Sequence, residues 1–392
     1  MGDIEVYQPK SFGTYEINGT RVTIWNDPDR LEQELLQIAP EDAKRIKRFV
    51  KDIKLSATMT MPTKVPMEMM SAKDGMKLLL SMRKLFTCCM SPDYTLMSLV
   101  VSLASIASGD GGVPKYVSRS MAQRMADRYC EMGGKLLLGQ EVDQILVKDN
   151  RACGIKLANG EEIVADYVIP ACDMHFTIET LLRNRYHIEE YENRYKDYRT
   201  YPVPTSVLVG IGVEADLSEY PDTFSWECKE IKVGNTQINR IAYKNYAYEK
   251  TFAPEGCTTI TTAFLQYDED YLVWKELYQN QEAYKKEKDR IGQFVKEEIE
   301  RVHPELQGKL RVLDVATPVT YERYCNAYHG AWMSFILKPG QKRLTFNGII
   351  PELSNCYLAG QWMISPGGLP GAVNSGKSAV QRICKAEGMP LM

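Results

Sequence analysis

The order of elements in residues 109–170 constrains the fold more than any other sequence feature. A turn at 109–112 precedes a stretch with apolar side chains at helical spacing, which ends at a Gly-Gly pair that favours a helix terminus. Three stretches with strand character follow, separated by turn dipeptides, and the last contains an apolar run. The helix is expected over 116–132 and the strands over 135–147, 152–157 and 162–170. This order of helix, strand, β-meander and buried strand predicts an α/β fold.

The N-terminal region predicts a hairpin followed by helices. Two β-type stretches, 12–17 and 20–25, flank Asn18-Gly19, the dipeptide that best tolerates a type I′ turn. Asp27 is expected to cap a helix that starts at Pro28. The predicted inward residues of this helix and the next are Leu31, Leu35, Leu36, Ile46, Phe49, Val50 and Ile53.

Residues 59–106 are helical in pattern and rich in methionine and leucine. They indicate either ordinary core with a basic edge, or a lining for a long apolar substrate or a face that contacts a membrane. The longest uncharged run, 94–109, is shorter than the ~20 residues that span a bilayer. No transmembrane helix is therefore expected.

The C-terminal half mixes strands with amphipathic helices. Strands are expected over 206–213, 238–246, 258–265 and 355–359, and a helix over 282–302 with its charged residues solvated. Its predicted inward residues are Ile291, Phe294, Val295, Ile299 and Val302. A glycine-rich loop over 360–371 leads into a helix over 372–385.

Composition excludes several classes of protein. The chain has 392 residues, 44% hydrophobic and 25% charged, with a net charge of -3, which excludes a disordered chain and a global basic field for nucleic acid. Ten cysteines form no CxxC pair and four histidines are dispersed. We therefore expect a cytoplasmic chain in a reducing compartment, with no metal site.

Residues 371–378 match the Walker A pattern GxxxxGK[ST]. That loop must follow a buried strand and precede further parallel strands, but Pro370 and two glycines come before it and only 14 residues follow Ser378. A nucleotide triphosphatase is therefore disfavoured. Two interpretations of this segment are equally supported. In one, a flat ring or a phosphate approaches the free backbone N–H groups at a helix N-terminus. In the other, the segment is a tight strand-to-helix connection that binds no ligand.

The same C-terminal segment carries a family resemblance. Asn-Cys-Tyr-Leu-Ala-Gly-Gln-Trp (355–362), Pro-Gly-Gly-Leu-Pro-Gly-Ala (366–372) and Ser-Gly (375–376) resemble the closing FAD motif of the phytoene desaturase-like flavoproteins, which include carotenoid desaturases, carotenoid isomerases and retinol saturase. Further stretches that resemble this family, in the same order, are 111–114, 134–145, 166–173, 317–324 and 330–331.

The resemblance implies a Rossmann-like FAD/NAD(P)-binding domain interleaved with a substrate domain of mixed sheet and helices. The substrate domain would comprise 1–108 and 175–345, and the FAD domain 109–174 and 346–392. Val142 would meet the adenine through its backbone, and Gly360 and Gln361 would follow the pyrophosphate and ribityl chain. The residues expected to let the flavin ring approach the helix N-terminus are Gly367, Gly368, Pro370, Gly371 and Ala372.

By the same resemblance the chain is an FAD-dependent oxidoreductase that desaturates, saturates or isomerises a long apolar polyene or lipid-like substrate. The catalytic candidates are Tyr328, His329 and Trp332, each of which has a packing role as its alternative. Peripheral contact with a membrane is a further expectation.

One departure from the family pattern is the absence of a GxGxxG turn. The family begins with a strand, this turn and a helix, whereas this sequence resembles the family from some tens of residues onward. Three readings stay open: a truncated or mis-assigned start, which we favour, a separate chain that supplies the unit, or a chain that does not bind FAD. The alternative function is thus a cofactor-less fragment or a non-catalytic binding module for apolar ligands.

Overall fold

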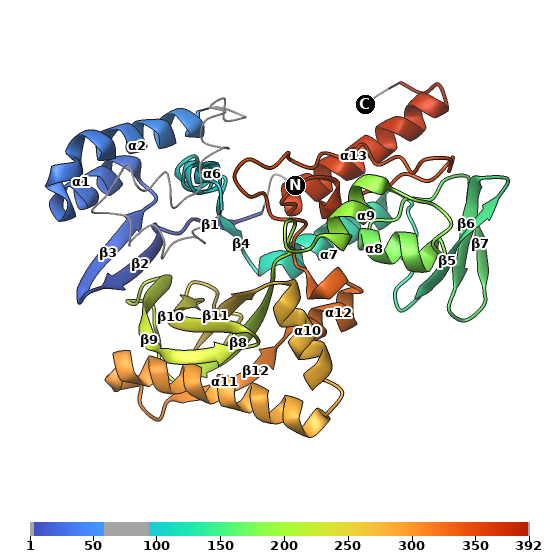
Figure 1. Ribbon diagram of the computed structural model, residues 1–392. Coiled ribbons are helices and arrows are strands. Elements are labelled where there is room, and N and C mark those ends of the chain that lie inside the picture. The colour runs from blue at the N-terminus through green and yellow to red at the C-terminus, as the bar shows by residue number, and fades with distance from the viewer. Residues whose placement is uncertain (1–3, 59–93, 391–392) are drawn as a thin grey trace.

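The structure, a computed structural model, describes residues 4–58 and 94–390 (Figure 1). Its largest element is a seven-stranded sheet in the order β12-β8-β11-β10-β9-β2-β3. These strands are β2 (Ser11–Ile17), β3 (Thr20–Trp25), β8 (Thr205–Val213), β9 (Thr223–Val233), β10 (Thr236–Asn245), β11 (Thr258–Gln266) and β12 (Leu310–Ala316). All neighbours are antiparallel except β2 and β9, where Thr14 lies opposite Phe224. The sheet therefore joins the N-terminal hairpin to strands far along the chain.

Local signals in the N-terminal region are confirmed. Asn18 and Gly19 both have positive φ, 52° and 78°, as a type I′ turn requires. Asp27 caps α1 (Pro28–Ile38), with its Oδ1 accepting a hydrogen bond from Arg30 N–H at 2.8 Å. The next elements are η1 (Pro40–Asp42), α2 (Ala43–Ala57) and α6 (Leu96–Ala107).

These helices and the β2–β3 hairpin share one hydrophobic core (Figure 1). All the inward residues predicted for α1 and α2 are buried except Leu36, which is half-buried. The methionine-rich stretch lies largely outside the described residues, over 59–93. Its described end, α6, buries Met97, Leu99, Val100, Leu103 and Ala104, so this part of the stretch is ordinary core.

Strands β8 to β12 share a hydrophobic core with α10 (Asp268–Leu277) and α11 (Gln281–Val302). Ile291, Val295 and Ile299 are fully buried as predicted. The prediction of a wholly solvated charged face is wrong at Glu298, which is 3% exposed. Its carboxylate accepts a 2.7 Å bond from Arg301, so the buried charge is paired. Beyond α11 come η5 (Pro304–Leu306) and α12 (Pro318–Cys325).

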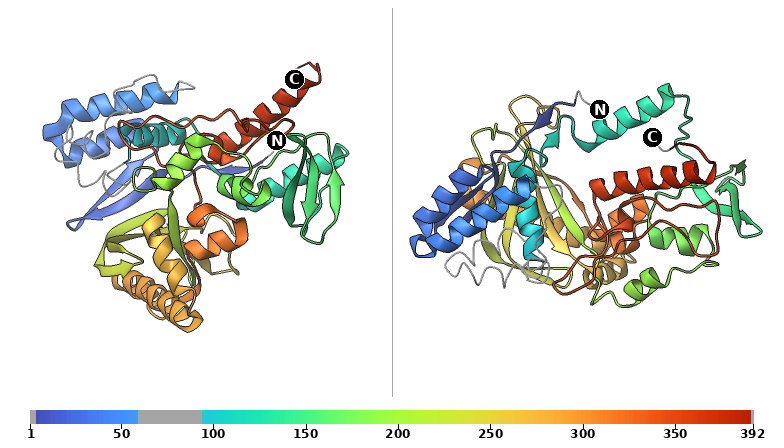
Figure 2. Two further views of the ribbon diagram at one scale, coloured as in Figure 1. Left: turned by 45° about the vertical axis from the view of Figure 1, so that its right-hand side comes forward. Right: turned by 90° about the horizontal axis from the view of Figure 1, so that it is seen from above.

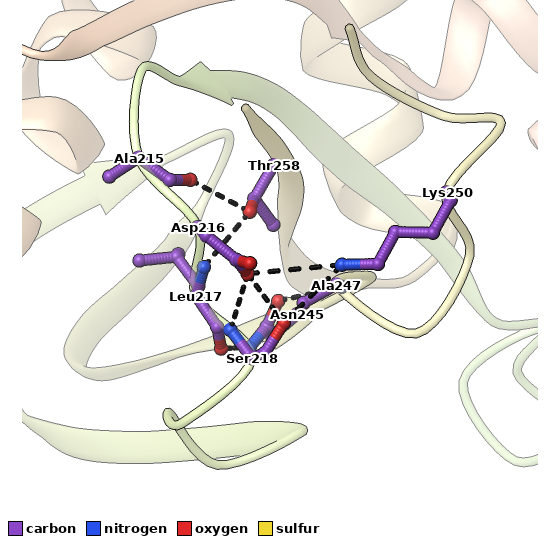
Figure 3. A network of polar contacts seen from close by, with 8 residues as sticks. All are labelled: Ala215, Asp216, Leu217, Ser218, Asn245, Ala247, Lys250 and Thr258. Carbon is purple, nitrogen blue, oxygen red and sulfur yellow. Dashed lines mark hydrogen bonds and ion pairs between the residues drawn. The ribbon is translucent and has the colours of Figure 1, made fainter. Parts of the chain in front are cut away.

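A polar network fixes the turn after β8 against the start of β11 (Figure 3). The buried Thr258 hydroxyl donates to Ala215 O at 2.8 Å and accepts from Leu217 N–H at 3.1 Å. Asn245 donates to Leu217 O at 2.9 Å. The side chains of Thr258 and Asn245 therefore form hydrogen bonds to backbone groups of the turn and hold three segments of the sheet region together.

A third core lies around the predicted meander. Its sheet contains β5 (Val142–Lys148), β6 (Arg151–Leu157) and β7 (Glu162–Val164), in that order. Neighbouring short elements are α8 (Met174–Phe176), η4 (Thr177–Leu181), α9 (Glu189–Lys196), η6 (Tyr328–Gly330) and η7 (Gln361–Met363).

Two strand predictions in this region were too long. The chain turns at Gly139, whose φ is +68°, so that 135–138 leads into β5 without sharing its ladder. After β7 the chain leaves the meander, and Val168 forms a single parallel bridge with Cys356. The meander itself is therefore limited to β5, β6 and β7.

Two long helices, α7 (Val117–Glu131) and α13 (Leu369–Ala386), lie in the same part of the molecule as the meander (Figure 2). Ahead of α7, β4 (Val113–Pro114) pairs with β1 (Val6–Tyr7). The helix predicted over 116–132 forms as α7, but its apolar face is not covered: no residue of α7 is fully buried. Within the described residues, no helix is long and apolar enough to cross a membrane.

Candidate cofactor and substrate site

The return segment 166–173 and the segment 355–360 run in parallel beside each other. Val168 N–H donates to Asn355 O at 2.9 Å, and Ala359 N–H donates to Pro170 O at 3.1 Å. This pairing brings Gly360, with φ of +112°, against Ala171: a Cβ on Gly360 would lie 3.2 Å from Ala171 O. A side chain at position 360 would therefore be both strained and crowded.

Ser375 links the Gly360 turn to α13. Its hydroxyl accepts a 2.9 Å hydrogen bond from Gly360 N–H and lies 2.7 Å from Ala372 O. The loop predicted over 360–371 is shorter than expected, because η7 and the first turn of α13 occupy part of that range. The start of α13 is held at a fixed distance from Gly360.

The N-terminus of α13 carries unused backbone donors. Gly368, with φ of +90°, is the N-cap and provides no side-chain acceptor. Among the described residues, no hydrogen-bond acceptor meets the N–H groups of Leu369 and Gly371, and Pro370 has none to donate. A Cβ on Gly368 would meet only Pro370 Cδ, at 3.9 Å. The helix end is therefore open to a hydrogen-bond acceptor or a negative charge.

Gly367 and Gln361 pack closely on this turn. A Cβ on Gly367 would lie 2.8 Å from Gln361 O and 3.1 Å from Ser334 N. Ser334 N–H in turn donates to Pro366 O at 2.9 Å. Gly367 is therefore required by the protein's own packing, whereas Gly368 leaves free space in front of the helix.

Val142, the first residue of β5, lies near the return segment. It lines a pocket of about 520 Å³ between β5 and the return segment, whose further walls include Ile145, Val168, Ile169 and Ala171. Ala171 lines this pocket and also lies beside Gly360.

Asp173 is a functional candidate that sequence reasoning did not single out. Its side chain is 6% exposed, with Oδ1 accepting from Phe176 N–H and Oδ2 from Tyr328 N–H, both at 3.1 Å. Burial raises the pKa of Asp173 to about 6, against the opposing effect of its N–H donors. Its place directly before the short helix α8 was the available signal, since Asp favours the N-cap.

Two of the three catalytic candidates are adjacent. The ring of His329 stacks between Tyr271 and Tyr328, with centroid distances of 4.4 and 3.9 Å. His329 Nδ1 is 2.8 Å from Oδ1 of Asp268, which is 1% exposed. Burial raises the pKa of Tyr328, so its phenol stays protonated. Trp332 is held differently: its indole is 43% exposed and its backbone N–H donates to Pro204 O at 3.2 Å.

Two pockets with mixed aromatic and charged walls lie next to residues that contact the His329 ring. One, of about 370 Å³, is lined by Met174, His175, Tyr191, Tyr195 and Tyr328 among others. Another, of about 380 Å³, has tyrosine and charged side chains in its walls, among them Tyr198, Tyr267, Arg199, Asp268, Glu269 and Lys338. Tyr328 and Asp268 thus join the two pockets to the His329 ring.

The Walker A pattern does not form a phosphate-binding loop. Gly371 through Ser378 all lie within α13, and the Ser378 hydroxyl donates to Asn374 O at 2.9 Å inside the helix. No group of His, Cys, Asp and Glu side chains suited to a metal ion is found in residues 4–58 and 94–390.

Comparison with known proteins identifies the family. The flavin-containing amine oxidoreductase family profile matches residues 79–384. The chain belongs to this family. Its curated relatives include a prolycopene isomerase of Daucus carota, 27% identical over 55% of this chain and 33% of that protein. A neurosporene-forming phytoene desaturase of Rhodobacter capsulatus is 25% identical over 47% of this chain and 40% of that protein. The matched region thus spans less than half of either relative.

Two solved structures share the fold of this chain. An oxidoreductase from Methanosarcina mazei superposes with a TM-score of 0.61 at 16% identity, covering 98% of this chain and 82% of that one. Cyclohexylamine oxidase from Brevibacterium oxydans superposes with a TM-score of 0.52 at 11% identity, covering 98% and 83%. The α/β fold of this flavin-containing amine oxidoreductase family member therefore extends over essentially its whole chain.

Proposed function

We propose that this chain is an FAD-dependent oxidoreductase that acts on a long apolar, polyene-like or lipid-like substrate by desaturation, saturation or isomerisation. The observation that carries the proposal is the open N-terminus of α13. The N–H groups of Leu369 and Gly371 lack partners among the described residues, and Gly368 leaves space before them. The carotenoid desaturases and isomerases among the relatives support the substrate class.

The residues present fit FAD. The backbone of Val142 would contact the adenine, and Gly360 with Gln361 would follow the pyrophosphate and ribityl chain. The first turn of α13 would hold the pyrimidine edge of the ring, where positive helix ends stabilise negative charge. When bound, FAD supplies hydride transfer to or from carbon.

The protein's own residues would orient the substrate and exclude water. The pocket beside Tyr328 includes Met174, Tyr191 and Tyr195, side chains of the kind that pack against an extended apolar chain, next to charged residues. His329, held on Asp268, is the group that could hold or move a proton at its Nε2. Tyr328, with its raised pKa, serves as a hydrogen-bond donor at neutral pH.

The second candidate function is an apolar-ligand binding module without catalysis of its own. The absence of a GxGxxG turn from the sequence favours it. The two candidates differ in flavin binding, because a module of this kind would take up a polyene and remain colourless.

An FAD titration tests the proposal. The purified chain should acquire flavin absorbance, and Gly368→Ala should weaken FAD binding about tenfold because the new methyl group projects before the helix donors. Gly256→Ala is the matched control: Gly256 also has positive φ, 77°, with nothing within 4 Å of the added Cβ, but lies in a distant turn. Failure to bind FAD, together with binding of a polyene, would favour the non-catalytic module.

A further inference from the structure

The ring of His329 is held on three sides by groups from other parts of the chain. It lies nearly parallel to the rings of Tyr271 and Tyr328, at interplanar angles of 17° and 19°. Its Nδ1 lies 2.8 Å from Oδ1 of Asp268. The His329 side chain is 20% exposed, and its Nε2 has no hydrogen-bond partner among the described residues. The uncovered side of the ring is therefore the edge that carries Nε2.

The backbone on both sides of His329 is fixed as well. His329 has a φ of 49°, in the left-handed region that residues with a side chain seldom adopt. The preceding Tyr328 donates its N–H to Asp173, and the O of the following Gly330 accepts a 2.8 Å bond from the buried hydroxyl of Thr205. Tertiary contacts rather than local preference therefore set the direction in which the ring points.

Helix α10 supplies two of the three groups that hold the ring. Asp268 and Tyr271 are three residues apart on this helix, so their side chains are neighbours on one face. Tyr271 is itself held by its hydroxyl, which donates to Glu322 Oε1 at 2.8 Å. Asp268 is 1% exposed, and its Oδ2 accepts a 3.0 Å hydrogen bond from Val203 N–H. One face of α10 thus fixes both an edge and a face of the imidazole.

The hydrogen bonds of Asp268 decide which ring nitrogen carries the proton. A carboxylate offers only acceptors, so Nδ1 of a neutral His329 ring must be the donor in this contact. The other carboxylate oxygen is already used by Val203 N–H. With the proton on Nδ1, Nε2 keeps its lone pair at the uncovered edge of the ring.

We propose that Asp268 is a positioning residue that keeps His329 in the form with its proton on Nδ1, so that Nε2 is an open proton acceptor. Asp268 acts through the ring and does not contact the substrate itself. The catalytic use of this acceptor rests on the proposed function, in which Nε2 would hold a proton of the substrate. The position of the proton on the free protein does not depend on that function.

Nitrogen-15 NMR of the histidine rings tests the proposal on the chain without any ligand. The sequence contains four histidines, and the signals of His329 are those lost in His329→Asn. Spectra are recorded at rising pH until the ring patterns stop changing, so that neutral rings are compared. The unmodified chain should show the His329 proton on Nδ1 alone. A proton on Nε2, or the averaged pattern of a free imidazole, would overturn the proposal.

Asp268→Asn should exchange the roles of the two ring nitrogens. Val203 is fully buried and its N–H needs an acceptor, so the amide oxygen of the new side chain stays on that side. The amide NH₂ group then faces Nδ1, which must accept, and the proton of His329 moves to Nε2. A proton that stays on Nδ1 in this variant would contradict the role of Asp268.

Asp270→Asn is the matched control on the same helix. Asp270 is 4% exposed, like Asp268, but its carboxylate accepts from Asn235 N–H at 2.7 Å. This variant should leave the nitrogen pattern of His329 unchanged, and the same reversal in both variants would refute a specific role of Asp268. If neither variant folds, the spectrum of the unmodified chain still decides between the two positions of the proton.

Diethyl pyrocarbonate, which acylates an imidazole nitrogen with a free lone pair, tests whether Nε2 is open. Peptide mass spectrometry should find His329 modified in the unmodified chain and, in Asp268→Asn, modified on the order of tenfold more slowly, the ratio that one hydrogen bond gives between the two ring forms. His187, 63% exposed, should react equally in both proteins. An unreactive His329 in the unmodified chain would overturn the proposal. Neither measurement requires flavin, so a failure here is distinct from a failure to bind FAD.

Discussion

Asp173 accepts a hydrogen bond from the backbone N–H of Tyr328, with 3.1 Å between Oδ2 and the nitrogen. This contact joins the end of the return segment to the loop that carries Tyr328 and His329, residues separated by more than 150 positions in sequence. Asp173 thereby connects the proposed cofactor route to the proposed substrate pockets, at a carboxyl group that burial makes costly to ionise.

The first prediction concerns the pH dependence of stability. Because the pKa of Asp173 is raised to about 6, the folded state keeps a proton that the unfolded state has already released above the ordinary Asp value. Stability from this group therefore falls as the pH rises from about 4 to about 6. Asp173→Asn does not titrate, so its stability relative to the unmodified chain should rise by about 2 kcal/mol across that window.

Urea unfolding of both proteins at several pH values measures this difference. If the substitution also weakens the hydrogen bond from Phe176 N–H or Tyr328 N–H, the free energy of unfolding falls by the same amount at every pH. The slope of the free energy against pH is then unaffected. Parallel stability curves from about pH 4 to 7 would show that Asp173 titrates normally.

The second prediction concerns the hydrogen bond between Ser375, on α13, and Gly360. Ser375→Ala removes the hydroxyl that bonds Gly360 N–H and should reduce stability by about 1 kcal/mol. Under the proposed function it should also weaken FAD binding, since Gly360 and the helix start lose their fixed spacing. Ser378→Ala is the control on the same helix, because that hydroxyl bonds only Asn374 O. Thermal unfolding and flavin titration report the two effects; equal behaviour of the two variants would refute the assigned role of Ser375.

The third prediction concerns His329. Asn tolerates the positive φ of 49° at this position but cannot exchange a proton near neutral pH. If His329 moves a proton, His329→Asn should lower kcat about tenfold or more on a polyene substrate. Trp332→Phe should have little effect on kcat, because its side chain is half-exposed and its anchoring contact is through the backbone.

Turnover as a function of pH separates a chemical role of His329 from packing. A proton-transfer role predicts that the dependence of kcat on pH changes in His329→Asn. A uniform decrease with the same profile would assign His329 to packing between Tyr271 and Tyr328.

The fourth prediction concerns the network in Figure 3. Thr258→Val keeps the shape of a buried side chain but leaves Ala215 O and Leu217 N–H without their partner. The free energy of unfolding should fall by about 1 to 3 kcal/mol. Thr261→Val, on the same strand, removes only a 3.4 Å contact with Tyr246 and should cost less than about 0.5 kcal/mol. Chemical denaturation compares the two, and a cost for Thr261→Val that matches or exceeds that for Thr258→Val would refute the assignment.

Local features of this protein were predictable because they depend on a few consecutive residues. Asn18-Gly19 specifies its turn through tolerance of positive φ, and Asp27 specifies a helix start through a contact three residues away. The motif at the C-terminus likewise pointed to the family, which the profile match shows.

The sequence by itself thus determined the caps, turns, most elements and the family. Tertiary structure decided which faces are covered and which distant groups meet. The apolar spacing of α7 is the same whether or not something packs on it, so only the structure shows that the face is open. The contacts of Asp173 with Tyr328 and of Ser375 with Gly360 join separate chain segments, and periodicity contains no information about such pairs. The Walker A pattern failed for the same reason, because residues 371–378 lie within the helix α13 and form no loop.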